Sequence, residues 1–307
     1  MILISIISPV YKASAILPEL VKRIENSLAP LTITYEIILV DDGCMQGSWN
    51  VISQICNNNN RVIGIKLSRN FGQHSAISAG IDKSKGEYII VMDCDLQDRP
   101  EEIPNLYFKA LEGYDIVLAR RVKRNDSFFK KLSSKFFYKT LEYLSDIEQD
   151  ETVANFGIYN HKVINAIKLM KEPIRFFPSM VKWVGFSKTS IEVKHDNRSI
   201  GKTTYNYKKL LNLAIDIILA YSIKPIIIVI KLGFLISFLS FIAALTYFLR
   251  WFSGTITLVG YSSLIISICF FSGLIIAILG VIGLYVAKTF ESAKNRPTYI
   301  IEKWLNF

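Results

Sequence analysis

Two carboxylates, Asp93 and Asp95, stand two residues apart after a short β-prone run at 88–92 and before a helix-like segment at 101–111. If strand geometry continues through them, side chains at this spacing leave on the same side. Carboxylates that converge repel each other unless a cation lies between them. Oxygen ligands of this kind suit Mg²⁺ or Mn²⁺, which usually share the phosphates of a substrate. The spacing therefore indicates a divalent-metal site, and a solvated turn is the alternative that the rest of the chain has to exclude.

The segments around this pair alternate between short apolar runs and helical stretches. The predicted strands are 2–7, 35–40, 61–67, 88–92 and 115–119, and the predicted helices are 13–28, 49–56, 73–83 and 101–111. Alternation at this spacing predicts an α/β fold with a mostly parallel sheet covered on both faces. Ligands of such sheets bind at the carboxyl ends of the strands.

Polar residues follow four of the predicted strands. The carboxyl ends of parallel strands lie along one edge of a sheet, so these residues are expected to form one site. They are Ser8-Pro9-Val10-Tyr11, Asp41-Asp42-Gly43, Ser68-Arg69-Asn70 and Asp93-x-Asp95. Neither Gly-x-Gly-x-x-Gly nor the full Walker pattern Gly-x-x-x-x-Gly-Lys-Ser/Thr occurs, which argues against a dinucleotide-binding Rossmann domain or a P-loop nucleotidase.

The composition points to a membrane. A formal net charge of +10 with a mean hydropathy of +0.31 fits a membrane surface better than nucleic acid. Four cysteines without paired spacing favour a reducing compartment and argue against a disulfide framework or a zinc site. The apolar N-terminus lacks a basic start, so a first buried strand explains it better than a signal peptide.

A basic stretch with interleaved aromatic residues follows residue 119. A solvated helix face would explain it, but beside an anionic ligand the same cations could clamp phosphates or contact lipid headgroups. The cations are Arg120, Arg121, Lys123, Arg124, Lys130, Lys131 and Lys135.

Two long apolar runs, about 225–249 and 262–287, dominate the C-terminal third. Each is long enough to cross the roughly 30 Å hydrocarbon core of a bilayer. The loop between them has one basic residue and both flanks have several, so the positive-inside rule places the flanks and the N-terminal domain in the cytoplasm. Two buried helices of a soluble core are the alternative.

The predicted organisation has three parts. An α/β domain spans 1–204, an amphipathic juxtamembrane helix spans 205–224, and a transmembrane hairpin with a short cytoplasmic tail spans 225–307. Such a chain would hold the α/β domain at the membrane surface.

Taken together, these residues resemble the family 2 glycosyltransferases of GT-A fold. More narrowly they look like the polyprenyl-phosphate glycosyltransferases, the group that contains dolichol-phosphate mannose synthase and the bactoprenol glucosyltransferases of O-antigen modification. The resemblance covers nearly the whole chain, and the Arg296-Pro297-x-Tyr299 segment after the paired spans matches the bacterial branch. The motifs that carry it are Ser8-Pro9-Val10-Tyr11, Val40-Asp41-Asp42-Gly43, Ser68-Arg69-Asn70-Phe71-Gly72, Asp93-x-Asp95-Leu96-Gln97-Asp98 and Arg198-x-x-Gly201-Lys202-Thr203.

The resemblance implies roles for named residues. Asp93, Asp95 and Gln97 would hold Mg²⁺ or Mn²⁺ on the diphosphate of a nucleotide-sugar, by family default a UDP-sugar. The implied donor-binding residues are Pro9, Tyr11, Asp41, Asp42, Arg69, Lys131, Arg198 and Lys202, with Lys130 as an alternative to Lys131. The implied catalytic residues are Asp93, Asp95, Arg121, Arg124 and Asn155.

The implied reaction is transfer of one sugar to polyprenyl (undecaprenyl) phosphate, with inversion by direct displacement, for O-antigen or other cell-envelope glycans. The resemblance places the protein in the bacterial cytoplasmic membrane with its catalytic domain in the cytoplasm. We expect a homo-oligomer and no nucleic-acid partner.

Two departures from the family pattern bear on this reading. The first loop continues with Lys12-Ala13 where the family usually has Asn-Glu, and Ala154-Asn155-Phe156-Gly157 stands where many bacterial members have Gly-Asp-Phe-Arg. The Asp of that pattern is often assigned as catalytic base, a role that an amide cannot take. A phosphate acceptor is already anionic near neutral pH, so Asn155 could assist by hydrogen bonding instead.

Two other functions fit parts of the sequence. A processive polysaccharide synthase shares the catalytic fold, but its Gln-x-x-Arg-Trp motif has only the near match Tyr247-Phe-Leu-Arg250-Trp251, and two spans are too few to build a pore. A non-catalytic nucleotide-sugar-binding module would account for Lys12, Ala13, Asn155 and Gly157, but the intact Asp93-x-Asp95-x-Gln97 set argues against it.

Overall fold

The computed structural model describes residues 2–121, 153–170, 175–194, 196, 218, 222–253 and 260–306. Among these, the residues up to 196 together with those from 296 onward form one compact unit, and the residues from 218 to 295 form a second. Each unit is described by itself below.

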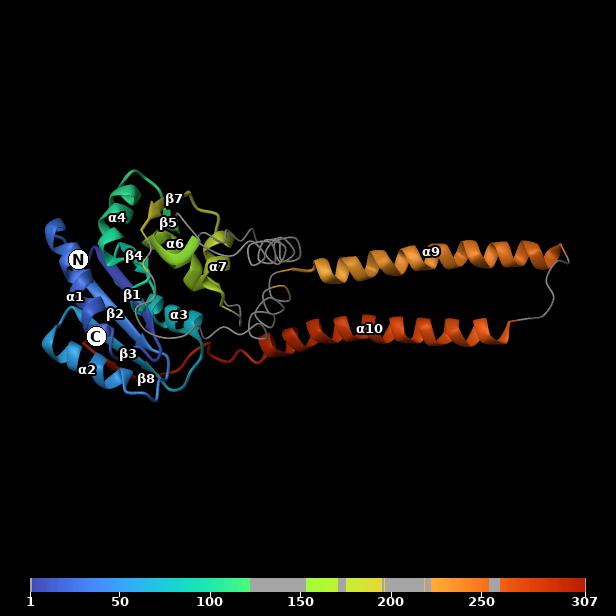
Figure 1. The fold of residues 1–307 in the computed structure, drawn as a ribbon, viewed down its shortest axis with the longest axis horizontal. Helices are drawn as coiled ribbons and strands as arrows, with labels where there is room; N and C mark the ends of the chain where they lie inside the picture. The colour runs from blue at the N-terminus through green and yellow to red at the C-terminus, as the bar shows by residue number, and fades with distance from the viewer. Residues whose placement is uncertain are drawn as a thin grey trace. The chain divides into compact units, whose positions relative to one another are not determined.

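The first unit is built on a mixed, mostly parallel sheet of eight strands in the order β7-β5-β6-β4-β1-β2-β3-β8 (Figure 1). β1 is parallel to β2 and β4, β2 is parallel to β3, and β5 is parallel to β7. Two strands run against the others: β6 pairs with β4 and β5, and β8 pairs with β3. The strands are β1 (Ile4–Val10), β2 (Tyr35–Asp41), β3 (Val62–Leu67), β4 (Tyr88–Val91), β5 (Ile116–Arg121), β6 (Val153–Asn160), β7 (Lys188–Val193) and β8 (Ile301–Leu305).

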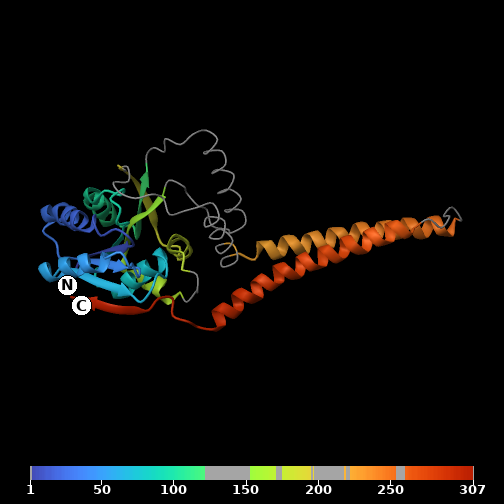
Figure 2. The same cartoon turned by 60° about the horizontal axis from the view of Figure 1, so that its bottom comes forward.

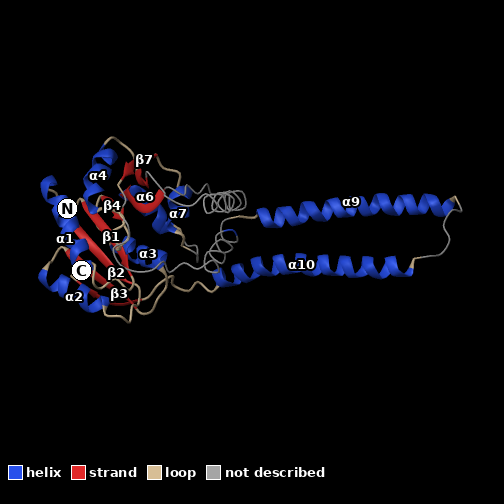
Figure 3. Ribbon diagram, viewed as in Figure 1, coloured by secondary structure: helices blue, strands red, loops and turns tan. Residues whose placement is uncertain are grey.

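Helices cover both faces of this sheet, because the central strands are apolar at consecutive positions and must be buried on both sides. On one face, α1 (Leu17–Leu28), α2 (Ser48–Asn58) and α4 (Ile103–Leu111) pack on strand residues such as Ile6. On the other, α3 (Gln73–Lys83), α6 (His161–Leu169) and α7 (Phe177–Trp183) pack on residues such as Ile7. Figure 3 shows this arrangement of helices and strands. Short 3₁₀ turns, η1 (Ala29–Leu31) and η2 (Pro100–Glu102), complete the unit.

The C-terminal residues return to the first unit. The sequence-based division assigned them to the membrane segment as a tail, whereas in the structure β8 extends the sheet next to β3, with Ile301 opposite Leu67. Tyr299 Oη donates a 2.6 Å hydrogen bond to Asp82 on α3, and Asn306 Nδ2 donates to the carbonyl of Cys56 on α2 at 2.7 Å. Sequence patterns give no sign of this pairing, because a five-residue strand is short and its partner lies more than 200 residues away.

The second unit contains two long helices, α9 (Lys224–Phe252) and α10 (Tyr261–Ala293), which lie side by side (Figures 1 and 2). Both are long and apolar enough to cross a membrane by length and composition, over Lys224–Ile242 and Phe270–Ala293, and the described residues of these windows are not buried. That lack of burial argues against the helices of a soluble core. Tyr285 Oη donates to the carbonyl of Ser222 at 2.9 Å within this unit. The amphipathic helix predicted at 205–224 falls mostly outside the described residues.

Candidate active site

Sheet topology brings the predicted site residues to one edge. β1, β2, β3 and β4 are mutually parallel, so their carboxyl ends, followed by Tyr11, Asp42, Arg69 and Asp93, lie along the same rim. Because β6 runs antiparallel between β4 and β5, the strands β5 and β7 also end at this rim. The expectation that these loops share one edge of the sheet is confirmed.

Asp41 ends β2 as a buried carboxyl. One oxygen, Oδ1, accepts a 3.2 Å hydrogen bond from the backbone N–H of Cys44, and Oδ2 is buried with no hydrogen-bond partner among the residues that the structure describes. Burial raises the pKa of this carboxyl to about 6. A buried acceptor left unpaired is costly, so Asp41 is well suited to accept a hydrogen bond from a ligand.

Asp42, the next residue, holds the neighbouring loop in place. Its two carboxylate oxygens accept hydrogen bonds from the backbone N–H groups of Phe71 and Gly72 at 2.7 and 3.0 Å. Burial raises its pKa above the ordinary value, and these two bonds oppose that shift. Gly43 has a φ of +62°, and a Cβ there would lie 2.2 Å from the carbonyl carbon of Arg69. The residues of the Asp-Asp-Gly motif therefore have different roles. Asp41 has a carboxylate oxygen without a hydrogen-bond partner among the described residues, whereas Asp42 and Gly43 hold the loop after β3 in place.

The two carboxylates of the Asp-x-Asp motif lie in a turn rather than on a continued strand, since β4 ends at Val91. Asp93 Oδ1 accepts a 2.6 Å hydrogen bond from Gln73 Nε2 on α3, and Asp95 Oδ1 accepts a 3.2 Å bond from the backbone N–H of Gln97. Leu96, which follows Asp95, is buried and has a φ of +58°, in the left-handed region. Both carboxylates are half-buried at the rim. Local turn geometry, and not the alternation of a strand, sets their placement.

Asn155 lies at the same rim. The antiparallel register pairs Val91, the last residue of β4, with Gly157 of β6, so Asn155 lies two residues beyond the paired segment, at the end of β4 that leads to Asp93. On its other side, the β5–β6 register shifts between Leu118 and Arg120, so Asn155 lies at a bulge. Bulges of this kind are frequent beside active sites, where they redirect a side chain.

Cations reach this rim from β5. Arg120 and Arg121 are its last two residues, and Arg120 is exposed. Gly157 stands where many bacterial members of the family were expected to carry Arg. A Cβ at this position would lie only 3.0 Å from the carbonyl oxygen of Val117, so a side chain would be crowded there. The tight packing of β5 against β6 therefore accounts for the glycine.

Other predicted donor-binding residues are placed as follows. Pro9 is buried within β1 opposite Val40, so it shapes the strand end, and Tyr11 beyond it is exposed. Arg69 stacks its guanidinium over the Phe71 ring at 4.2 Å. The side chain of Arg121 lies outside the described part of the structure, as do Arg124, Lys130, Lys131, Arg198 and Lys202.

Sequence reasoning missed two groups that hold the Asp-x-Asp loop. Gln73 bonds Asp93, and Arg99 forms a bidentate pair with Asp196 just beyond β7. The partners are 20 and 97 residues apart, so no local pattern could have joined them.

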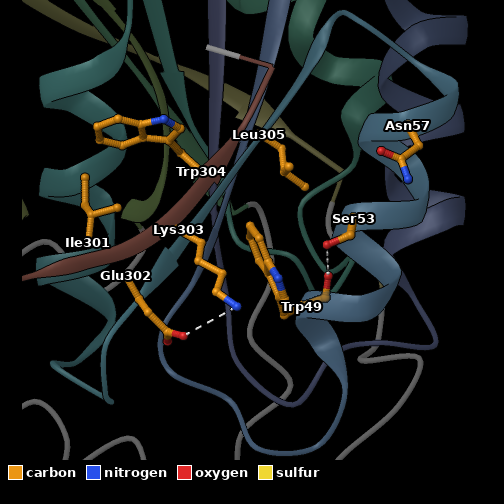
Figure 4. A pocket seen from close by; sticks show the side chains of 8 residues that line it. All are labelled: Trp49, Ser53, Asn57, Ile301, Glu302, Lys303, Trp304 and Leu305. Atoms are coloured by element: carbon orange, nitrogen blue, oxygen red, sulfur yellow. Dashed lines mark hydrogen bonds and ion pairs between the residues drawn. The ribbon is translucent and has the colours of Figure 1, made fainter.

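A hollow of about 500 Å³ lies elsewhere, between α2 and β8 (Figure 4). Its lining includes Trp49 and Ser53 from one element and Lys303 and Trp304 from the other. It contains none of the rim carboxylates, so it is separate from the site described above.

Comparisons with known proteins identify the family of the chain. The model of the family described as glycosyl transferase family 2 matches residues 5–169. A glycosyltransferase of unassigned function from Synechocystis sp. is 38% identical over 97% of this chain and 94% of that protein. The undecaprenyl-phosphate 4-deoxy-4-formamido-L-arabinose transferase of Proteus mirabilis is 34% identical over 98% of this chain and 93% of that protein.

Among solved structures, the first unit is similar in fold to glucosyl-3-phosphoglycerate synthase from Mycobacterium tuberculosis, determined with Mn²⁺, UDP-glucose and phosphoglyceric acid. The TM-score is 0.50 at 12% identity, over 71% of this chain and 78% of the other. The fold and the family match thus define an α/β glycosyltransferase domain, followed by two apolar helices. The chain belongs to glycosyl transferase family 2, as its sequence motifs indicated.

Proposed function

We propose that this protein transfers one sugar from a UDP-sugar to polyprenyl phosphate at the cytoplasmic face of a bacterial membrane. The observation that carries the proposal is the similarity, over both units, to a transferase whose acceptor is undecaprenyl phosphate. The two apolar helices of the second unit support it, because they would hold the enzyme in the membrane that contains such an acceptor. The cell-envelope destination of the product and a homo-oligomeric assembly belong to the same proposal.

Asp41 supports a uridine donor. Its buried Oδ2 has no hydrogen-bond partner among the described residues, so the ionised carboxylate could accept a hydrogen bond from a ligand N–H. Uracil presents an N–H at ring position 3, whereas cytosine presents a lone pair there, so an ionised carboxylate favours uracil. The M. tuberculosis protein of similar fold binds UDP-glucose.

Asp93, Asp95 and Gln97 fit a divalent ion on the donor diphosphate. Within the described residues, no group of three or more His, Cys, Asp or Glu side chains could by itself enclose a metal. Two carboxylates that leave the remaining positions to water and phosphate oxygens are typical of Mg²⁺ and Mn²⁺ sites. When bound, the ion would neutralise charge on the departing nucleoside diphosphate.

The remaining rim residues would orient the acceptor. An oxygen of the polyprenyl phosphate attacks the anomeric carbon, the bond from that carbon to the diphosphate oxygen breaks, and the nucleoside diphosphate leaves with the electron pair. Because the phosphate is already anionic, Asn155 would hold it by a hydrogen bond and would not need to remove a proton. Arg120 and Arg121 at the end of β5, together with Arg124 and Lys131, would attract the acceptor and donor phosphates.

The test is direct transfer. Detergent-purified protein is incubated with undecaprenyl phosphate, Mg²⁺ or Mn²⁺ and a panel of labelled nucleotide-sugars, and label is counted in the organic phase. We expect EDTA-sensitive label from a UDP-sugar, unchanged in a Glu112→Gln control whose exposed carboxylate pairs with Lys109 on α4. Metal-dependent nucleotide-sugar binding with no transfer from any donor would favour the non-catalytic module instead.

A further inference from the structure

Arg99 and Asp196 form a two-point ion pair next to the Asp-x-Asp turn. Arg99 Nε donates to Asp196 Oδ2 at 2.6 Å, and its terminal nitrogen donates to Oδ1 at 2.5 Å. Each side chain is about one-third exposed, at 35% and 36%. A bidentate guanidinium–carboxylate pair fixes orientation as well as distance, which a single contact does not do.

Asp196 also bonds the turn through its backbone. Its N–H donates to the carbonyl of Gln97 at 3.0 Å. Asp196, which lies between β7 and the Arg198 motif, therefore holds the turn at two points. These points are the Gln97 carbonyl and the Arg99 side chain, which lie on either side of buried Asp98.

The turn held in this way is strained. Leu96 has a left-handed φ of +58°, which costs a residue with a side chain about 1–2 kcal/mol. Such a conformation persists only where surrounding contacts enforce it. Gln97 N–H in turn donates to Asp95 Oδ1, so the rotation of the Asp95 carboxylate is linked to the backbone that Asp196 fixes.

We propose that Arg99 is a positioning residue for the metal and diphosphate site, acting through Asp196 on the Asp95–Gln97 turn. The inference rests on the proposed function, since it concerns how that site is held. Arg99 does not contact the reacting atoms in this scheme. It keeps Asp95 and Gln97 in the arrangement that the ion and the diphosphate require, and supporting contacts of this kind typically change metal affinity by about 10- to 100-fold when they are removed.

The same domain offers a matched control for a purely structural role. Arg23 on α1 and Glu101 on η2 form an equivalent two-point pair, with N···O distances of 2.8 and 2.6 Å. Glu101 is only two residues from Arg99, but it pairs with Arg23 on α1 and not with a residue beyond β7. Losing this pair removes a similar bidentate interaction while leaving the contacts of Asp196 with the turn in place.

The experiment compares Arg99→Lys with Arg23→Lys in the full-length protein in detergent. Lysine keeps the charge and loses the two-point geometry. Mn²⁺ affinity is measured with the metal alone by electron paramagnetic resonance of free Mn²⁺, and again in the presence of UDP. Melting temperature, donor KM, acceptor KM and kcat complete the comparison.

We expect Arg99→Lys to weaken Mn²⁺ binding by about 10-fold or more and to raise donor KM, with acceptor KM unchanged. Arg23→Lys should lower the melting temperature by a similar amount and leave Mn²⁺ binding at the wild-type value. The exchanged pair, Arg99→Asp with Asp196→Arg, should recover part of the lost Mn²⁺ affinity.

Equal Mn²⁺ affinity in the two lysine variants would overturn the proposal, as would a wild-type protein that binds no Mn²⁺ with or without UDP. Failure of the proposed transfer reaction is distinguishable from this, because the metal measurement needs no acceptor and no turnover. A protein that binds Mn²⁺ through an Arg99-dependent site and transfers no sugar would retain the positioning role and lose the proposed function.

Discussion

Replacing Asp41 with asparagine tests the electrostatics of the buried carboxyl at the end of β2. The side chain is fully buried, and burial raises its pKa from 3.8 to about 6. A raised pKa means that the folded protein destabilises the ionised carboxylate relative to the protonated carboxyl. Its contribution to stability is therefore present below its unfolded pKa and is lost as the pH rises through about 6.

The magnitude follows from the shift. About two pKa units correspond to about 3 kcal/mol over the full titration. About 2 kcal/mol of this falls between about pH 4.5 and about pH 7.5, where a detergent-solubilised protein can be compared. An amide does not titrate, so the free energy of unfolding of Asp41→Asn, taken relative to wild type, should increase by about 2 kcal/mol as the pH rises over this range. For a domain of this size, the difference in melting temperature should change by about 4–8 °C.

The assay is thermal unfolding of both proteins across this pH range without ligand. Other titrating groups are common to the two proteins and cancel in the difference. A melting-temperature difference that stays constant with pH would refute the reasoning, because it would mean that Asp41 titrates near its ordinary pKa. The same variant should bind UDP about 10-fold more weakly or worse near neutral pH, since a hydrogen bond to a charged acceptor is lost.

Four further changes test other parts of the rim and the sheet. Asp95→Ala should abolish sugar transfer while the protein remains folded and membrane-inserted, and normal turnover would contradict the metal assignment. Asn155→Asp should retain transfer, because the acceptor supplies its own negative charge; complete loss would show that the amide is required. Gly43→Ala should destabilise the first unit by about 1–3 kcal/mol through its clash with the Arg69 backbone, and Gly47→Ala, with positive φ and open space around it, should cost less in the same denaturation assay. Asn306→Ala should lower stability by about 1 kcal/mol, because its amide bonds the carbonyls of Cys56 and Val62; an unchanged melting temperature would show that these bonds do not contribute to holding β8.

Local sequence patterns predicted most of the secondary-structure elements. The alternating strands and helices up to residue 121 were predicted with boundaries that differ from the observed ones by a few residues, and the two apolar runs are helices. These features depend on periodicity and composition within a short window, which a sequence displays directly. The parallel sheet then fixed the common rim, because parallel strands all end on one side.

The site could be predicted only in part, because a sequence shows residue types and does not show their hydrogen-bond partners. Residue types after the strands identified Asp41, Asp93 and Asp95, since such carboxylates stand out at strand ends. The roles within the motifs did not follow from type: Asp41 and Asp42 are chemically identical neighbours, yet one has an unpaired buried oxygen and the other binds the loop after β3. Backbone partners from another loop decide that difference.

The sequence by itself determined the element types, the two candidate spans, the family and the carboxylates of the rim, because each is encoded in contiguous residues. Tertiary structure alone decided the position of β8 beside β3 and the pairing of Arg99 with Asp196. Those contacts join residues from 97 to more than 200 positions apart. Their energy comes from burial and hydrogen bonding that exist only once the chain has folded, so no local spacing records them.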